Sequence, residues 1–425
     1  MRKNRLFANT LMLYGMTGAN YLLGLIALPY LTRVLGARLY GRIGLGTAFA
    51  SYVQLFLDFG FVLSGTALVV RAGRDKKELS AALSAVTWCR LILLGVSFLA
   101  AVGLCLWVPP FKEDGRLYLL FWAYMAVSSL IPNFLFRGME QMGPITCGTL
   151  LTKLIFVLGI FTFVKEDSEY WLVPVFYLAG AFAALLFAGL YVRMRLGLEL
   201  VKISLTVVKA TFAQSRQFFF SRLAAAVCGG MNTLILGVLY PDTEALGFYS
   251  AAERLIAAGK AGMTPVSDSL YPYMMREGRM GLAGKVMVMG ECVCLAVCAV
   301  AFIFAQPICR VLLGEEYAGA AGILRCMLPQ LLFVFPSYIL AFPVLTPLGM
   351  VKWANTSVAA GALVQLAGGG MLWIAGKLCV YELCILTCVT EGVVLGIRVW
   401  AAVRGLRGGL AELLHKRKEQ KGERH

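Results

Sequence analysis

The sequence predicts an all-α integral membrane protein with twelve transmembrane helices in two pseudo-symmetric six-helix lobes around a central cavity. Of the 425 residues, 60% are hydrophobic and only 15% are charged. A water-soluble domain of this size needs more charge to cover its surface. The apolar residues also gather into stretches of membrane-spanning length, and a polar interval at 193–216 divides these stretches six and six.

Twelve apolar stretches are each long enough to cross about 30 Å of hydrocarbon at about 1.5 Å per residue. We expect all of them to be helices, because a spanning backbone must satisfy its own hydrogen bonds. The strict alternation of barrel strands does not occur in the sequence. The stretches cover residues 8–35, 43–70, 79–108, 117–136, 145–164, 171–192, 217–240, 245–273, 286–309, 319–346, 353–375 and 378–403.

The polar interval in the middle of the chain defines the expected domain organisation. Leucines and valines recur within it together with lysines, a pattern that indicates an amphipathic helix lying on a membrane surface. We therefore expect an N-lobe with spans one to six at 1–192, a cytoplasmic interfacial linker at 193–216, a C-lobe with spans seven to twelve at 217–403, and a basic cytoplasmic tail at 404–425.

Basic residues outside the spans predict the orientation. If the N-terminus is cytoplasmic, 24 Lys and Arg residues fall on the cytoplasmic side and 8 on the opposite side. Lys and Arg prefer cytoplasmic loops, so both termini are expected there. The net charge of +16 then reflects orientation and contact with anionic lipids. No basic stretch is interleaved with aromatic residues outside the apolar stretches, so we expect no nucleic-acid partner.

A faint internal repeat supports two related halves. Leu39–Ile43 and Ala245–Tyr249 are similar and place Gly41 and Gly247, 206 positions apart, at the start of an even-numbered span. Duplicated bundles that meet at a central cavity are a common design of transporters.

The sequence lacks the motifs of ATP hydrolysis and of nucleophilic catalysis. Gly259 and Lys260 are followed by Ala261, so no phosphate-binding loop is formed. The only histidines, His415 and His425, lie in the tail. No span therefore holds an imidazole that could activate a nucleophile or join the twelve cysteines at a zinc site. We expect no catalytic residues, no metal and no cofactor.

Charged residues inside the spans are the candidate functional residues, because each is costly in hydrocarbon and usually faces a cavity or a partner. The eighth span is the richest. At about 100° per residue, Arg254, Lys260 and Asp268 lie within about 120° of one another, and Pro265 among them is expected to kink the helix. The full set is Asp58, Arg90, Lys153, Arg222, Glu253, Arg254, Lys260, Asp268, Glu291, Arg325, Glu391 and Arg398.

Two interpretations of these charges stay open. They can form a cationic surface for an anionic substrate, since a guanidinium donates to two phosphate oxygens at once. Alternatively, they pair with one another, for example Arg254 with Asp58 or Lys260 with Glu291. Arg398 lies closer to the cytoplasmic end of its span, where a long side chain is expected to reach the membrane surface.

Seven segments, in order along nearly the whole chain, carry a family resemblance. They are ALPYLTRVLGARLYGRIGLG (Ala27–Gly46), FLDFGF (Phe56–Phe61), NFLFRGMEQM (Asn133–Met142), ALGFYSAAERL (Ala245–Leu255), YPY (Tyr271–Tyr273), LLGEEYAGAAGIL (Leu312–Leu324) and LTPLGMVKWAN (Leu345–Asn355). Together they resemble the polysaccharide (O-antigen type) flippases of the MOP superfamily. Arg137 stands where that family's pattern has glutamine.

The resemblance implies a MATE-like fold and a flippase function. Such a protein moves a polyprenyl-pyrophosphate-linked oligosaccharide across the bacterial cytoplasmic (inner) membrane by alternating access, for cell-surface polysaccharide biosynthesis. Its implied partners are this glycan, membrane lipids, and the glycosyltransferases and polymerase of the same pathway. Arg254 matches an arginine of related lipid flippases, and Arg33 and Arg42 lie near their cavity or gate arginines.

The sequence thus predicts two groups of site residues. The pyrophosphate-binding residues of the cavity are expected to be Arg254, Lys260, Arg222, Arg90, Arg33 and Arg42. The candidates for ion coupling or charge pairing are Asp58, Glu253, Asp268 and Glu291.

Two alternative functions remain. A multidrug or cation exporter of the same superfamily would rely on buried carboxylates, but seven basic residues stand against five acidic ones in the spans. A membrane glycan polymerase would need a large external catalytic loop, whereas the external loops here have only about ten residues each.

Overall fold

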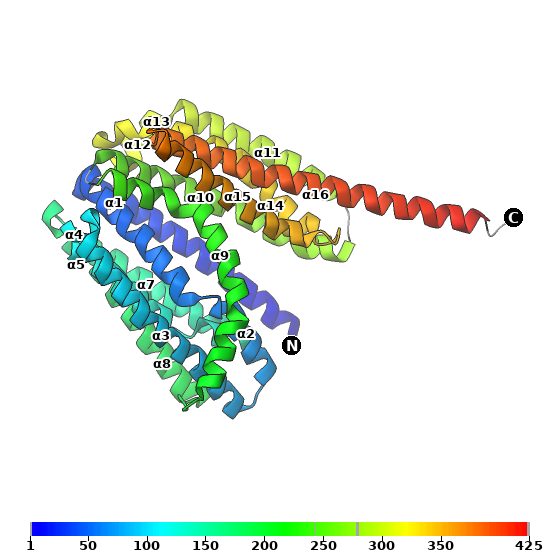
Figure 1. The fold of residues 1–425 in the computed structure, drawn as a ribbon, viewed down its shortest axis with the longest axis horizontal. Helices are drawn as coiled ribbons and strands as arrows, with labels where there is room; N and C mark the ends of the chain where they lie inside the picture. The colour runs from blue at the N-terminus through cyan, green and yellow to red at the C-terminus, as the bar shows by residue number, and fades with distance from the viewer. Residues whose placement is uncertain (1, 242, 278–279, 423–425) are drawn as a thin grey trace. The chain divides into compact units, whose positions relative to one another are not determined.

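The structure is a computed structural model that describes residues 2–241, 243–277 and 280–422. Regular secondary structure in these ranges is helical throughout (Figure 1), which confirms the all-α prediction. The chain divides into two compact units. Unit 1 comprises Met1–Ala226, Gly230–Ala251 and Arg310–Tyr317, and unit 2 comprises Val227–Gly229, Ala252–Cys309 and Ala318–His425.

In unit 1, helix α7 packs along α8, α5 packs against α1, α3 and α8, and α2 packs against α6. Fully buried aromatic side chains, among them Phe61, Phe121 and Phe134, fill the space between these helices. The elements are α1 (Arg2–Asp58), α2 (Phe61–Ala72), α3 (Lys76–Trp107), α4 (Pro109–Glu113), α5 (Gly115–Leu130), α6 (Asn133–Gly138), α7 (Met142–Phe163), η1 (Asp167–Glu169), α8 (Leu172–Tyr191), the π-helical turn η2 (Val192–Leu196) and most of α9 (Leu205–Leu239).

In unit 2, α16 packs against α13, α14 and α15, while α11 packs against α14. α16 continues from the predicted twelfth span into the basic tail as far as Gly422, and the last three tail residues lie outside the described ranges. The elements are most of α10 (Glu244–Glu277), α11 (Met280–Ile303), the first part of α12 (Ala305–Leu313), the end of η3 (Glu315–Gly319), α13 (Ala320–Met327), α14 (Pro329–Ile339), the π-helical turn η4 (Leu340–Val344), α15 (Val351–Ile374) and α16 (Val380–Gly422). The rest of α12 and of η3 belongs to unit 1.

Nine helices of the described chain are long and apolar enough to cross a membrane, or ten if the bent pair Glu315–Met327 and Pro329–Val344 forms one span. Leu23–Ala72 counts once in this number, although non-helical backbone at Gly36 divides it where the first predicted span ends. α10, the predicted eighth span, is not in this set because polar and charged residues recur along it. A multi-pass membrane protein is therefore confirmed, while the number twelve and the two symmetric lobes stay predictions.

The break at Gly36 is stabilised by the residues that follow α12. Gly36 has φ 68° and ψ 174°, a region that favours glycine. The backbone N–H of Ala37 donates to Glu316 Oε1 at 3.2 Å, and the Tyr317 hydroxyl donates to the Gly36 carbonyl at 3.2 Å. Glu316 thus caps the helix that restarts after the break, satisfying a backbone donor that has no partner within that helix.

The two glycines of the internal repeat contact each other within unit 1. A Cβ on Gly41 would lie 2.9 Å from the backbone nitrogen of Gly247, and a Cβ on Gly247 would lie 1.9 Å from the carbonyl oxygen of Ala37. α1 and α10 therefore cross with their backbones in contact, which small residues permit between membrane helices. The internal repeat points to both glycines in the sequence, but it does not predict that they contact each other.

The linker predicted at 193–216 is helical only in part. Residues 197–204 have no regular secondary structure, and α9 begins at Leu205. The backbone N–H of Val201 donates to the buried Ser84 hydroxyl of α3 at 2.8 Å. The prediction of one amphipathic helix here is therefore wrong for 197–204, where serine hydroxyls of α3 accept hydrogen bonds from the backbone.

Candidate functional site

Asp58 is the last residue of α1 and is only 2% exposed. The chain leaves the helix here through two residues with positive φ, Phe59 at 40° and Gly60 at 83°, before α2 begins at Phe61. The motif FLDFGF thus places a carboxylate at a helix break in the unit's interior. A buried charge of this kind is costly unless it is paired and hydrogen-bonded.

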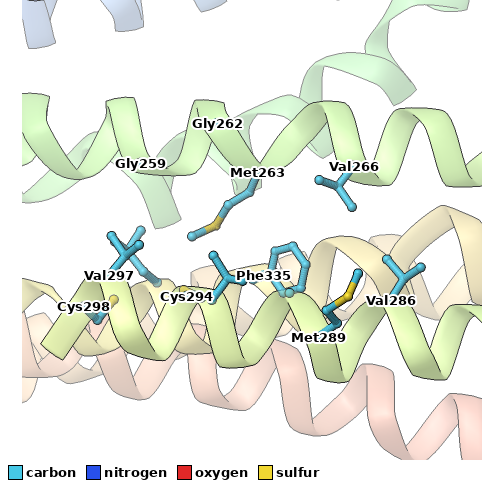
Figure 2. A pocket seen from close by; sticks show the side chains of 13 residues that line it. Gly259, Gly262, Met263, Val266, Val286, Met289, Cys294, Val297, Cys298 and Phe335 are labelled. Carbon is cyan, nitrogen blue, oxygen red and sulfur yellow. The ribbon is translucent and has the colours of Figure 1, made fainter. Parts of the chain in front are cut away.

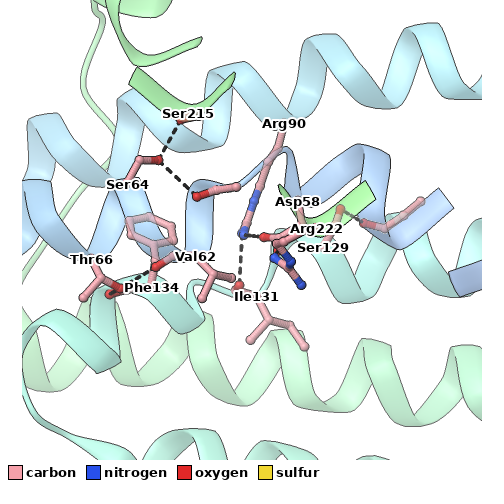
Figure 3. A network of polar contacts seen from close by, with 12 residues as sticks. Asp58, Val62, Ser64, Thr66, Arg90, Ser129, Ile131, Phe134, Ser215 and Arg222 are labelled. Carbon is pink, nitrogen blue, oxygen red and sulfur yellow. Dashed lines mark hydrogen bonds and ion pairs between the residues drawn. The ribbon is translucent and has the colours of Figure 1, made fainter. Parts of the chain in front are cut away.

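α9 packs directly on the backbone of this break. A Cβ at Gly60 would lie 2.8 Å from the carbonyl oxygen of Ser215, so glycine permits the approach. The Ser215 hydroxyl also hydrogen-bonds a serine of α2 at 2.7 Å (Figure 3). The ring of Phe59 stacks on Phe219 with centroids 4.7 Å apart. These contacts fix the register of α9 and bring Arg222 to the Asp58 carboxylate.

Arg90 approaches the same carboxylate from α3 and is 3% exposed. Its Nη1 donates at 3.2 Å to the carbonyl of Ile131, which lies between α5 and α6. That carbonyl is outside the α5 hydrogen-bond ladder because Pro132 ends the helix. The guanidinium also lies 5.5 Å from the ring centroid of Phe134, within cation–π range. Arg90 is therefore held by neutral groups on one side and needs Asp58 on the other.

Asp58, Arg90 and Arg222 form one cluster, which we call the Asp58 cluster (Figure 3). Nη2 of Arg90 lies 3.4 Å from Oδ1 of Asp58, while Arg222 pairs with Oδ2 of the same carboxylate. Two guanidinium groups on one carboxylate leave the cluster with a net charge of +1. The Arg222 side chain is 42% exposed, whereas that of Arg90 is 4% exposed. Arg222 can therefore offer donors to an anion, and Arg90 serves as the buried support.

The basic residues of α10 lie in unit 2. Arg254 is exposed, and Lys260 follows six residues later, about 9 Å further along the helix axis. Nζ of Lys260 lies 3.1 Å from Oε1 of Glu391 on α16, with side chains 23% and 18% exposed. Lys260 thus pairs with Glu391 and not with Glu291, the partner weighed from the sequence.

The remaining acidic candidates occupy different environments. Glu253 is half-buried on α10, and Asp268 is exposed further along the same helix. Glu291, in the middle of α11, has a buried Oε2 without a hydrogen-bond partner among the described residues. None of the three belongs to the Asp58 cluster. Of the four carboxylates predicted for ion coupling or charge pairing, Asp58 alone lies in this cluster.

Arg33 and Arg42 lie at the Gly36 end of unit 1. Arg33 is exposed and donates to the backbone carbonyl of Val311. Arg42 lies 3.7 Å from the Asp114 carboxylate, next to Tyr170. Burial, followed by the hydrogen bond to Asp114, raises the pKa of Tyr170 above its usual value. Tyr170 therefore stays a neutral donor to Asp114, and Arg42 is part of a polar group rather than an isolated charge.

Two roles are not evident from the sequence. Glu391 is the partner of Lys260 across 131 residues, and no local pattern signals that pairing. Arg398 does not reach the membrane surface, so that prediction is wrong: the residue is 7% exposed and donates to Ser337 at 2.8 Å and Ser357 at 2.9 Å. Polar acceptors on α14 and α15 draw its guanidinium inward.

These observations define a multi-pass helical membrane protein with a buried cationic cluster. A family model described as polysaccharide biosynthesis protein matches residues 6–277. The chain therefore belongs to the polysaccharide biosynthesis protein family, which confirms the family resemblance of the sequence motifs.

The chain is 24% identical over 365 residues to a protein of Escherichia coli (strain K12) named "Putative O-antigen transporter", covering 84% of this chain and 88% of that protein. Two solved structures share its fold. The lipid II flippase MurJ, inward closed, has a TM-score of 0.74 at 10% identity, covering 96% of this chain and 93% of that chain. An inward-facing MATE family transporter of the MOP superfamily has a TM-score of 0.66 at 14% identity, covering 93% and 94%.

Proposed function

We propose that the protein is a flippase that moves a polyprenyl-pyrophosphate-linked oligosaccharide across the membrane by alternating access, and that it is not an enzyme. Membership of the polysaccharide biosynthesis family and similarity to a protein named as an O-antigen transporter support this function. The observation that carries it is the Asp58 cluster, in which an excess guanidinium, Arg222, is 42% exposed in the membrane region.

The chemistry of the cargo explains why such a cluster is useful. A pyrophosphate cannot cross hydrocarbon without donors that replace its water, and arginine supplies two parallel hydrogen bonds. Arg254 and Arg222, both exposed, are the proposed direct contacts. Arg90 is too buried to touch a large substrate and is proposed to position Asp58 and Arg222. A small number of contacts lets the cargo leave again.

The other predicted residues have narrower proposed roles. Lys260 offsets Glu391 and contributes a secondary cationic contact through its exposed part. Arg33 and Arg42 are proposed to guide the headgroup near the Gly36 break. The proposed location is the bacterial inner membrane with both termini cytoplasmic, where glycosyltransferases and a polymerase of the same pathway would supply and consume the cargo.

The exporter alternative is less well supported by the geometry. A cationic drug needs an accessible carboxylate. Two arginines pair with Asp58, and the exposed Asp268 lies on α10, the helix that also carries the exposed Arg254. The polymerase alternative lacks a candidate catalytic loop, because the described segments between helices are short.

The test is complementation of a deletion strain. We expect Arg254→Ala to abolish surface display of the glycan and Arg254→Lys to restore part of it, with equal amounts of membrane-inserted protein on immunoblots. Normal display in Arg254→Ala would remove Arg254 from the proposed site. If deletion altered drug resistance while glycan display stayed normal, the exporter would replace the flippase.

A further inference from the structure

An apolar groove lies in unit 2 between α10, α11 and α14 and has a volume of about 410 Å³ (Figure 2). α10 forms one wall with Gly259, Gly262, Met263 and Val266, and α11 forms the other. Figure 2 shows Met263 and Val266 pointing from α10 toward α11. No charged side chain lines the groove, although Lys260 lies on the same stretch of α10.

The groove has a buried floor and an exposed rim. Leu331 and Phe335 of α14 form the floor and are 6% and 4% exposed. Met289, Val293 and Val297 of α11 line the rim and are 60–68% exposed. α11 is a candidate membrane span, and apolar side chains exposed on such a span face hydrocarbon. The groove therefore opens to the lipid chains of the membrane.

Glycines create the hollow. Gly259 and Gly262 lie about one turn apart on α10, and a Cβ at Gly262 would meet nothing within 4 Å. The Phe335 ring sits directly over Gly290 of α11, where a Cβ would lie 2.1 Å from it. A hollow with a flexible methionine wall adapts to an irregular apolar chain, such as one that carries methyl branches.

The length and position of the groove match a segment of a lipid tail. Its lining runs from Val286 to Cys298 on α11, about 18 Å at the rise of a helix and more than half of the hydrocarbon thickness. At the Gly259 end, the exposed Arg254 lies five residues away on α10, about 7.5 Å along the axis. The groove face carries no charge, while the neighbouring turn of the same helix offers a guanidinium to an anionic headgroup.

We infer that this groove binds the isoprenoid chain of the carried lipid while the basic residues of α10 hold its phosphates. The inference rests on the proposed function for the identity of the lipid. It assigns the tail a site on the protein, so that the lipid stays attached to unit 2 during translocation of its headgroup.

The test uses the purified protein in nanodiscs and a sugar-free polyprenyl diphosphate with a diazirine in its isoprenoid chain. We expect photolabelling of the groove residues of α11, identified by mass spectrometry. Gly262→Leu fills the hollow and should reduce this labelling at least tenfold. Gly396→Leu is the matched control, because Gly396 of α16 is also exposed, helical and open around its Cβ. This control should label like the wild type.

Two results would refute the proposal that the groove binds the lipid tail. One is equal labelling in Gly262→Leu and the wild type, and the other is equal labelling by a phosphatidylglycerol that carries the same diazirine. The outcome is independent of the proposed function, which depends on glycan display in cells. An unlabelled groove in a protein required for display would refute the tail site alone, while normal display in the deletion strain would refute the flippase alone.

Discussion

Removal of the Asp58 carboxylate should destabilise the protein far more than removal of its exposed partner. In Asp58→Asn, Arg90 loses the charge 3.4 Å away and keeps only neutral partners in a site that is 3% exposed. Breaking a buried ion pair from one side costs about 3–5 kcal/mol. In Arg222→Gln, Asp58 keeps Arg90, and the lost group is 42% exposed, so the cost should be at most about 1 kcal/mol.

A double variant tests whether the unpaired charge of Arg90 causes the loss of stability in Asp58→Asn. Asp58→Asn combined with Arg90→Met removes the orphaned charge and keeps an apolar chain where the aliphatic stem of the arginine lies. We expect the double variant to recover about 2 kcal/mol of the loss in Asp58→Asn, because the two residues are coupled.

The assay is unfolding of the purified protein in mixed micelles by titration with sodium dodecyl sulfate, followed by tryptophan fluorescence. Arg222→Gln is the matched control for loss of one charge from the same cluster. Equal losses in Asp58→Asn and Arg222→Gln would refute the assignment of Arg90 as the buried support. A double variant no more stable than Asp58→Asn would also contradict it.

Three further predictions use the same preparations. Gly247→Ala should cost about 3 kcal/mol of unfolding free energy, because its Cβ would lie 1.9 Å from a carbonyl oxygen. Gly369→Ala is the control: the space around its Cβ is open, so the variant should gain up to about 1 kcal/mol. A larger loss in Gly369→Ala than in Gly247→Ala would contradict the close crossing of α1 and α10. Arg398→Met should cost about 3 kcal/mol through unsatisfied buried acceptors, and a loss below about 0.5 kcal/mol would mean that its side chain lies at the surface. Lys260→Glu should impair glycan display, and the swap Lys260→Glu with Glu391→Lys should restore part of it, because the swap rebuilds the ion pair but not the cationic contact on α10. A swap that displays no more glycan than Lys260→Glu at normal protein levels would contradict the role of the pair.

Much of the fold follows from the sequence because a membrane leaves few choices for a long apolar segment. The stretch 145–164 closely matches α7, Met142–Phe163. The first predicted span and part of the second instead form α1 across Gly36, since a single positive-φ residue turns the chain without a loop. The second predicted span is itself divided at Phe59 and Gly60. Hydropathy also does not distinguish a surface helix from a segment without regular secondary structure, and at 197–204 the hydrogen bond from Val201 to Ser84 stabilises the irregular backbone.

The candidate site was only partly predictable. Each charge inside a span was visible as unusual, but its partner lies far away in the sequence. Asp58 and Arg222 are 164 residues apart, and Lys260 and Glu391 are 131 apart. Tertiary packing determines which charges pair, through contacts such as that of α9 with Gly60. The direction of Arg398 likewise depends on acceptors supplied by two other helices.

Translocation in reconstituted liposomes tests the central claim most directly. The substrate is a polyprenyl-pyrophosphate that carries a fluorescent disaccharide, and the measurement is the fraction of headgroups that become accessible to a membrane-impermeant quencher over time. We expect the wild type to transfer headgroups between leaflets and Arg254→Ala to do so at least tenfold more slowly. A wild-type rate equal to that of protein-free liposomes would contradict the flippase function, and an unchanged rate in Arg254→Ala would contradict the assignment of Arg254 to the binding site.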